Sequence, residues 1–167
     1  DVLAALPGCR RVHLTGVTLA LSDGARQACV ALAREAAAAG IPVSLDVNHR
    51  PGLWSVDEAG AALAQILPHV ATVIASEDEL PLLVDAPEAE AVAHLLAGGA
   101  SEVVVKRGER GASAWSADAE AHVPARAVEV VDVIGAGDAL CAGLLSGLLD
   151  GLPLAAALAR GTAVAAA

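Results

Sequence analysis

Short apolar runs alternate with longer amphipathic stretches along most of this chain, and the alternation limits the folds open to it. The runs suited to strands lie at residues 11–16, 42–48, 71–76 and 102–108. The stretches with helical periodicity lie at residues 22–40, 57–67 and 87–98, and a short helix is expected near Glu77. Three strand–helix–strand repeats with Val-rich strands predict a parallel sheet covered by helices on both faces. Ligands of such sheets bind at the carboxyl ends of the strands.

The rhythm changes after Gly111. Closely spaced runs at residues 111–117, 120–125 and 127–133 predict short antiparallel strands at one side of the sheet. A helix is predicted over 136–149, and Pro153 begins another. The predicted fold class is therefore α/β, with three layers: a mostly parallel sheet, helices on both faces and a short antiparallel edge.

The composition suits such a fold and argues against several kinds of partner. Hydrophobic residues make up 56% of the 167 residues, but there are two Trp and no Phe, Tyr or Met, so Ala, Val, Leu and Ile must build the core. This length fits one domain, which is our working assumption. The net charge of −10 argues against binding to nucleic acid or to anionic membranes. No apolar stretch reaches the roughly 18 residues of a membrane span, so we expect a cytoplasmic protein.

The cysteines and the two ends of the chain carry less information. Cys9, Cys29 and Cys141 are widely separated and form no CxxC pattern, so neither a disulfide framework nor a zinc site is predicted. The chain begins at Asp1 rather than Met and stops at Ala167 within an apolar helical pattern. We therefore expect a piece of a longer protein.

The segment 132–138, Asp-Val-Ile-Gly-Ala-Gly-Asp, is the most informative part of the chain. It leads from a strand end through two glycines directly into a helix. Glycine lets the backbone approach a ligand closely, and the first amides of a helix have no partners within it. These amides predict an anion site, and Asp138 places a carboxylate beside it, where a sugar hydroxyl and a terminal phosphate could meet. A purely structural role for Asp138, complementing the helix dipole, stays open.

Two other nucleotide-binding motifs are excluded. The chain has no GxxxxGK[ST] phosphate loop. The stretch that starts at Gly135 has Leu140 where the dinucleotide fingerprint needs Gly or Ala, and too little chain follows it for a ribose-binding unit. A dehydrogenase with a dinucleotide cofactor is therefore not expected.

Four segments, in order along the chain, resemble the ribokinase-like (PfkB-type) carbohydrate kinases. The helix start Gly135–Asp138, followed by Ala139 and by Ala142 and Gly143, is similar to the signature of that family. Upstream, the segment 46–54 resembles the D-x-N-x-R-x-x-L-W stretch of its 2-keto-3-deoxygluconate kinase branch. The segments 75–80 and 105–112 resemble its N-x-x-E element and its K-x-G-x-x-G loop. The resemblance covers most of the chain and implies the ribokinase-like fold.

This resemblance implies catalytic roles at the helix start. Asp138 would be the base that receives the proton of the sugar hydroxyl, and it would contact the sugar. The amides of Gly135, Ala136 and Gly137 would form the anion hole for the transferred phosphoryl group. Phosphoryl transfer has a loose transition state, so the hydroxyl needs little deprotonation until late and a weakly basic Asp can serve.

It also implies sites for cations. Glu79, with Ser76 nearby, would hold Mg²⁺ through water, because Mg²⁺ usually keeps several of its waters. Alternatively, Glu79 is simply a carboxylate in the first turn of a helix. Asp132 keeps open a site for a monovalent cation such as K⁺, although Val133 and Ile134 replace the threonines of many members. Ser76 stands where many members have Asn.

The loop that contains Lys106 supplies positive charge for ATP. Lys106 is the only lysine of the chain, and with Arg107 and Arg110 it places three of the ten basic residues within five positions. The implied ATP contacts in this loop are Lys106, Arg107, Gly108, Glu109, Arg110, Gly111 and Ala112. The other implied ATP contacts are Asn48, Arg50, Ser76 and the amides of residues 135–137. Arg50 could instead pair with a sugar-acid carboxylate, and a solvated surface role stays open for it and for the loop.

The resemblance implies a carbohydrate kinase that uses ATP and Mg²⁺. Its partner would be a small-molecule sugar or sugar acid, with 2-keto-3-deoxygluconate as the first choice. Fructokinase, ribokinase and 5-dehydro-2-deoxygluconokinase are alternatives, and a non-catalytic nucleotide-binding module is a different class. A homo-oligomer stays open. In the family, the sugar pocket and its lid come mostly from the region before Asp1, and part of the adenine pocket comes from beyond Ala167. Thr162 falls where members often carry a small polar residue near the adenine. Residues 1–167 would then be the nucleotide-binding and catalytic part.

Overall fold

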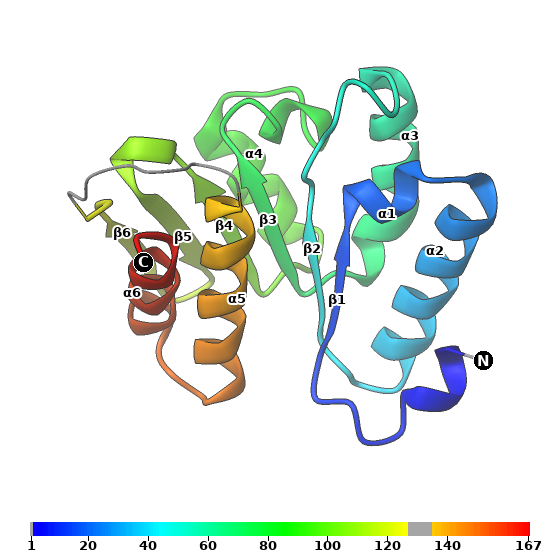
Figure 1. Ribbon diagram of the computed structural model, residues 1–167, viewed down its shortest axis with the longest axis horizontal. Helices are drawn as coiled ribbons and strands as arrows, with labels where there is room; N and C mark the ends of the chain where they lie inside the picture. Colours follow the sequence, from blue (N-terminus) through cyan, green and yellow to red (C-terminus); the bar gives the residue numbers. More distant parts are fainter. Residues whose placement is uncertain (1, 127–134) are drawn as a thin grey trace. The chain divides into compact units, whose positions relative to one another are not determined.

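The computed structural model describes residues 2–126 and 135–167 (Figure 1). The strands form one sheet in the order β1-β2-β3-β4-β5-β6, with helices around it. The chain divides into two compact units, Asp1–Val103 and Val104–Ala167, and the division falls within β4 (Glu102–Lys106). The mostly parallel α/β architecture with a short antiparallel edge, predicted from the sequence, is confirmed.

The first unit is built on parallel strands. These are β1 (Val12–Thr15), β2 (Val43–Asp46) and β3 (Thr72–Ser76), and their register pairs Leu14 with Leu45 and Leu45 with Val73. All four residues of β2 are buried, as expected for a strand covered on both faces. Because the strands are parallel and in register, their carboxyl ends lie at the same edge of the sheet.

Four α-helices accompany these strands. They are α1 (Gly16–Ala20), α2 (Asp23–Ala38), α3 (Val56–Ile66) and α4 (Glu88–Ala97). The side chain of Ser22 caps α2 by accepting the amide of Ala25, and Ser55 and Glu58 close the start of α3 with a reciprocal capping box. Short 3-10 turns lie at Val2–Ala5 (η1), Leu67–His69 (η2) and Leu80–Leu82 (η3).

Two details of this unit differ from the prediction. The helix α1 follows β1 at Gly16, where the sequence predicted only a strand ending in glycine. Five residues are too few to show a helical period, so the pattern could not reveal it. The short helix expected near Glu77 is instead the 3-10 turn η3, with Pro81 at its beginning.

The second unit contains the antiparallel edge. β5 (Ala112–Ser116) and β6 (Glu120–Val123) pair antiparallel, with Ser113 opposite His122. The 3-10 turn η4 (Gly108–Arg110) connects β4 to β5. The strand predicted over 127–133 lies outside the described residues.

The helices α5 (Ala136–Leu149) and α6 (Leu154–Ala165) complete the second unit, and the bounds of α5 are those predicted. The two helices pack closely through small residues. A side chain at Gly143 would place its Cβ 2.8 Å from the Cα of Gly161, so glycine is needed at this crossing. Among the described residues, no helix is both long and apolar enough to cross a lipid bilayer.

Candidate active site

In the first unit, polar residues gather where β2 and β3 end. Asp46 ends β2 and is 1% exposed, Asn48 follows it at 9%, and Ser76 ends β3 half-buried. Buried polar groups at this edge must be satisfied by hydrogen bonds or by a ligand. The edge is the one at which a parallel sheet binds ligands. The structure therefore brings the predicted residues Asn48, Ser76 and Glu79 to one place.

Glu79 joins the two strand ends. One carboxylate oxygen, Oε1, accepts the backbone amide of His49 at 2.7 Å, and the other, Oε2, accepts the amide of Ser76 at 2.8 Å. The side chain is only 8% exposed, and hydrogen bonds to a carboxylate are stronger than those between neutral groups. These two hydrogen bonds could not be predicted from the sequence, because neither amide belongs to a motif that predicts an acceptor.

The turn after β2 has an unusual backbone. Asn48 has φ +38°, and it is the only non-glycine residue with positive φ among the described residues. Asparagine tolerates this region better than most residues, but the conformation still costs free energy that its surroundings must offset. Arg50 follows on the exposed part of the turn.

In the second unit, the predicted ATP loop is a tight turn between β4 and β5. The amide of Arg107 donates to the carbonyl of Gly111 at 2.8 Å, and Gly108 and Gly111 have φ of +56° and +93°. A Cβ at Gly111 would lie 2.0 Å from the carbonyl oxygen of Val123, so only glycine fits there. Ala112 is buried at the start of β5, and Glu109 and Arg110 are exposed.

The two basic side chains at the start of this loop have different surroundings. The Nζ of Lys106 lies 3.8 Å from where a Cβ of Gly137 would stand. Arg107 instead donates from Nε to the hydroxyl of Ser113 at 2.9 Å, and its guanidinium lies 5.8 Å from the ring centroid of Trp115. Lys106 is thus beside the helix start, whereas Arg107 packs on β5.

The start of α5 is open. Gly135 is its N-cap residue in the left-handed region, with φ +83°, and its carbonyl accepts the amide of Ala139 at 2.8 Å. Within the described part of the chain, no side chain caps this helix. Gly135, Gly137 and Asp138 are exposed, and Ala136 is half-buried. The turn is therefore accessible, and the Nζ of Lys106 lies beside it.

Two further predicted positions lie elsewhere. Asp132 is outside the described residues. Thr162 is 5% exposed within α6, and its hydroxyl donates to the carbonyl of Ala159 at 3.1 Å.

The residues present fit a magnesium ion held indirectly. Each oxygen of the Glu79 carboxylate accepts one amide and keeps lone-pair capacity for a water molecule. In the described ranges, no three His, Cys, Asp or Glu side chains gather into a cluster that could bind a metal ion. Magnesium typically takes one or two carboxylates, waters and substrate phosphates. Glu79 suits such a site as a partner of the metal's waters.

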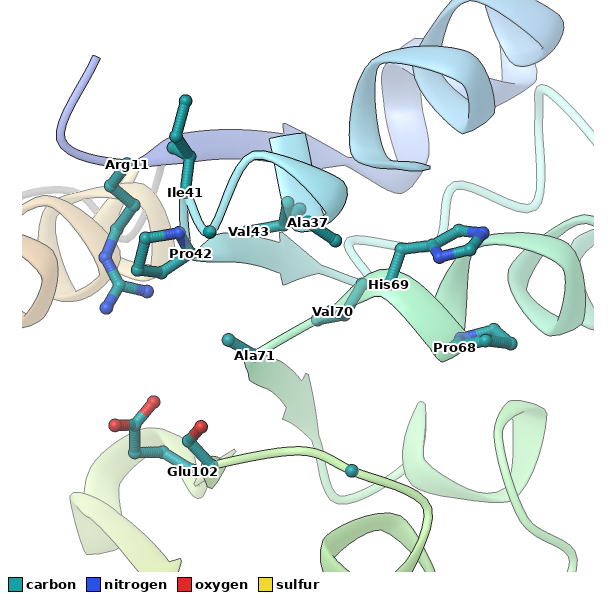
Figure 2. A pocket seen from close by; sticks show the side chains of 13 residues that line it. Arg11, Ala37, Ile41, Pro42, Val43, Pro68, His69, Val70, Ala71 and Glu102 are labelled. Carbon is teal, nitrogen blue, oxygen red and sulfur yellow. The ribbon is translucent and has the colours of Figure 1, made fainter. Parts of the chain in front are cut away.

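A cavity of about 380 Å³ lies at the opposite ends of the strands (Figure 2). Figure 2 shows Arg11 and Glu102 on one side of it and Pro68 and His69 on the other. Arg11 donates to the Thr72 hydroxyl at 2.8 Å, which donates to Glu102 at 2.6 Å. Burial lowers the pKa of the Arg11 guanidinium, and Glu102 opposes this effect. The cavity contains none of the predicted site residues, and its charged groups tie the strands together.

Known proteins resemble this chain along nearly its whole length. The profile of one family, described as pfkB family carbohydrate kinase, matches residues 3–167. A 2-dehydro-3-deoxygalactonokinase of Haloferax volcanii is 36% identical over 157 residues, which cover 92% of this chain and 49% of that protein. A 2-dehydro-3-deoxygluconokinase of Bacillus subtilis is 32% identical over 164 residues, 93% of this chain and 49% of that protein.

A solved structure also resembles this chain along nearly its whole length. A protein described as a ribokinase II of E. coli, in complex with ATP and Mg²⁺, matches with a TM-score of 0.89 and 31% identity. The match covers 98% of this chain and 53% of that protein. This chain spans about half the length of the proteins it matches.

Proposed function

Because the chain belongs to the pfkB family of carbohydrate kinases, we propose that the whole protein transfers the terminal phosphoryl group of ATP to a hydroxyl group of a sugar or sugar acid. The first candidate acceptor is 2-keto-3-deoxygluconate. The names of two relatives, which are kinases of 2-dehydro-3-deoxy sugar acids, support this choice. Fructokinase, ribokinase and 5-dehydro-2-deoxygluconokinase activities are the alternatives.

The observation that carries the proposal is the open start of α5 beside Lys106. Helix amides with no side-chain cap bind anions, and the helix dipole favours negative charge at this end. The ammonium group of Lys106 adds a full positive charge next to Gly137. In a chain of net charge −10, this is where a polyphosphate would be attracted.

In this proposal, Asp138 receives the proton of the acceptor hydroxyl and contacts the sugar. It lies in the first turn of α5 and is exposed, so a substrate can reach it. The amides of Gly135, Ala136 and Gly137 stabilise the negative charge on the transferred phosphoryl group. Such preorganised donors are worth a factor of about 10² to 10³ in turnover.

We further assign ATP contacts to Asn48, Arg50 and Ser76, and to the loop 106–112. Glu79 meets Mg²⁺ through water, and when bound the ion neutralises charge on the phosphates. Arg50 is exposed and could also pair with the carboxylate of a sugar acid. Asp132 contributes to a K⁺ site. We assign the whole protein to the cytoplasm.

The test is an assay of ADP release by the full-length protein over a panel of neutral sugars and sugar acids. We expect turnover with a sugar acid that exceeds turnover with fructose or ribose by at least tenfold. If a neutral sugar is turned over faster, the proposed acceptor is wrong, but the proposed phosphoryl transfer from ATP stands. Binding of ATP without turnover on any member of the panel would favour the non-catalytic module.

A further inference from the structure

Three side chains form a stack behind the turn that carries Asn48 and Arg50. The ring of His49 stacks on that of Trp54, with centroids 6.5 Å apart and an angle of 26° between the planes. The guanidinium of Arg26, from α2, lies 5.9 Å from the centroid of the Trp54 ring. Arg26, Trp54 and His49 are called the Trp54 stack below.

The Trp54 stack holds one side of the turn while Glu79 holds the other. His49 lies between the two predicted ligand contacts, Asn48 and Arg50, and its amide is fixed by Glu79 at 2.7 Å. Its ring is fixed by Trp54, which is only 5% exposed. The positive φ of Asn48 needs this support, because an isolated turn would relax to a more favourable conformation.

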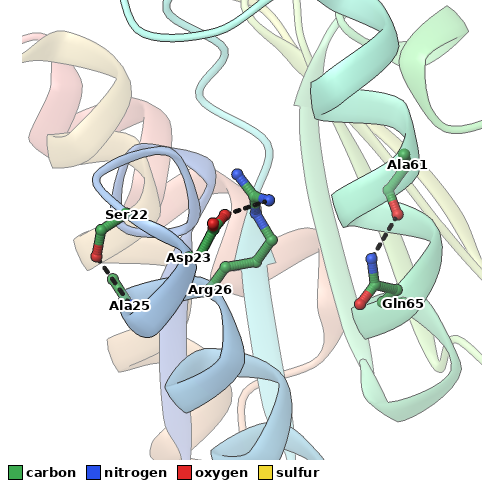
Figure 3. Close-up of polar contacts among 6 residues, drawn as sticks. All are labelled: Ser22, Asp23, Ala25, Arg26, Ala61 and Gln65. Carbon is green, nitrogen blue, oxygen red and sulfur yellow. Dashed lines mark hydrogen bonds and ion pairs between the residues drawn. The ribbon is translucent and has the colours of Figure 1, made fainter.

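The neighbours of Trp54 leave it little freedom. A Cβ at Gly16 would lie 1.9 Å from the carbonyl oxygen of Val47 and 3.6 Å from Cζ2 of Trp54, so the start of α1 presses against the strand end and the indole ring. Figure 3 shows Arg26 on α2, with its ion pair to Asp23 drawn as a dashed line at 3.1 Å.

The Trp54 stack contains buried polar atoms that lack a hydrogen-bond partner. Within residues 2–126 and 135–167, the buried side-chain nitrogen and oxygen atoms without a hydrogen-bond partner are Arg26 Nε, His49 Nε2 and Trp54 Nε1. Leaving a buried polar group unpaired costs free energy. All of them belong to one cluster beside the candidate site, and such local costs are typical of functional sites.

We propose that Arg26 is a positioning residue for ligand binding: through Trp54 and His49 it fixes the turn that presents Asn48 and Arg50 to ATP. Arg26 itself contacts no ligand in this proposal. The inference rests on the proposed function, because that function assigns ATP contacts to the turn. Arg26 lies on α2, outside every motif found in the sequence.

The experiment measures ATP affinity of the full-length protein by calorimetry, which does not require turnover. Arg26→Met keeps the aliphatic stem but removes the charge over the ring, and should weaken ATP binding by about three- to tenfold. Arg26→Lys should recover most of the affinity. Arg34→Met removes an exposed arginine of the same helix, paired only with Glu35 at 3.0 Å among its described contacts, and should change nothing.

A second pair of variants, at Trp54, controls for a loss of folding. Trp54→Phe keeps an aromatic ring for both neighbours and should bind ATP within about twofold of wild type, whereas Trp54→Leu should match Arg26→Met. Arg26→Met with unchanged ATP affinity overturns the proposal, even if its melting temperature falls, because the role would then be structural only. Failure of Arg26→Lys to recover affinity also overturns it.

The outcomes separate this proposal from the proposed function. If the full-length protein binds ATP but phosphorylates no acceptor, the kinase activity is wrong while the comparison of Arg26 variants still decides the positioning role. If the protein does not bind ATP, both proposals fall.

Discussion

Several predicted site positions have backbone conformations that few non-glycine residues adopt. Asn48 has φ +38°, Gly111 has φ +93° and Gly135 has φ +83°. At Gly111 the approach of the Val123 carbonyl excludes any side chain, and at Gly135 the left-handed backbone starts α5. Positive φ for these residues costs little at glycine and more at asparagine.

Lys106 should matter more for ATP than its neighbour Arg107. In the full-length protein, Lys106→Met should weaken ATP binding by about 10- to 100-fold, because a hydrogen bond to a charged group is worth about 1.5–3 kcal/mol. Calorimetry would measure the dissociation constant, with Arg34→Met as the control for loss of one positive charge. An affinity within twofold of wild type would mean that Lys106 does not meet the phosphates.

Some residue roles could be predicted from the sequence, and others could not. The uncapped helix start at Gly135 could be predicted, because the glycines and the first helical turn are contiguous in the chain. The direction of the Arg107 side chain was not, since it depends on Ser113 and Trp115, which β5 brings alongside. The tie made by Glu79 and the stack on Trp54 likewise depend on neighbours that only the folded sheet supplies.

The helices differ in whether a side chain caps their first turn. We call a capped start closed and an uncapped start open. α3 begins with a capping box in which Ser55 and Glu58 satisfy each other's backbone amides. α5 begins at a glycine without a side-chain cap in the described chain. A closed start stabilises its helix, while an open start leaves amides for a ligand. Caps and periodicity predicted both helices almost to the residue, but the five residues of α1 carried no usable pattern.

The capping box of α3 predicts a pH dependence of stability. Hydrogen bonds from the amide and hydroxyl of Ser55 lower the pKa of the Glu58 carboxyl below its ordinary value. Its contribution is therefore present above the unfolded-state pKa, about 4.3, and is lost as the pH falls through the lower folded value.

Glu58→Ala should then lower the melting temperature at pH 7, and the difference from wild type should shrink toward pH 3. Ser55→Ala removes the other half of the box and should cost about 1 kcal/mol at pH 7. Melting curves of the full-length protein at both pH values give the comparison. An equal loss for Glu58→Ala at pH 3 and pH 7 would mean that its ionised form does not stabilise the helix.

The net charge of the chain bears on where an anion can bind. The chain carries a net charge of −10, so an anionic substrate is repelled except where local positive charge and helix amides oppose the field. Lys106 beside the start of α5 is such a place within the second unit. This chain spans about half the length of the relatives it matches.

In the proposed reaction, the start of α5 gathers phosphate charge next to a carboxylate that takes up a proton. Its most direct test is the turnover number of full-length Asp138→Asn with saturating ATP and the preferred acceptor. We predict a loss of several powers of ten with ATP affinity nearly unchanged, because asparagine keeps the shape but cannot accept the proton. A variant that retains more than about a tenth of the wild-type turnover would contradict the claim, since general-base removal typically costs 10²- to 10⁴-fold.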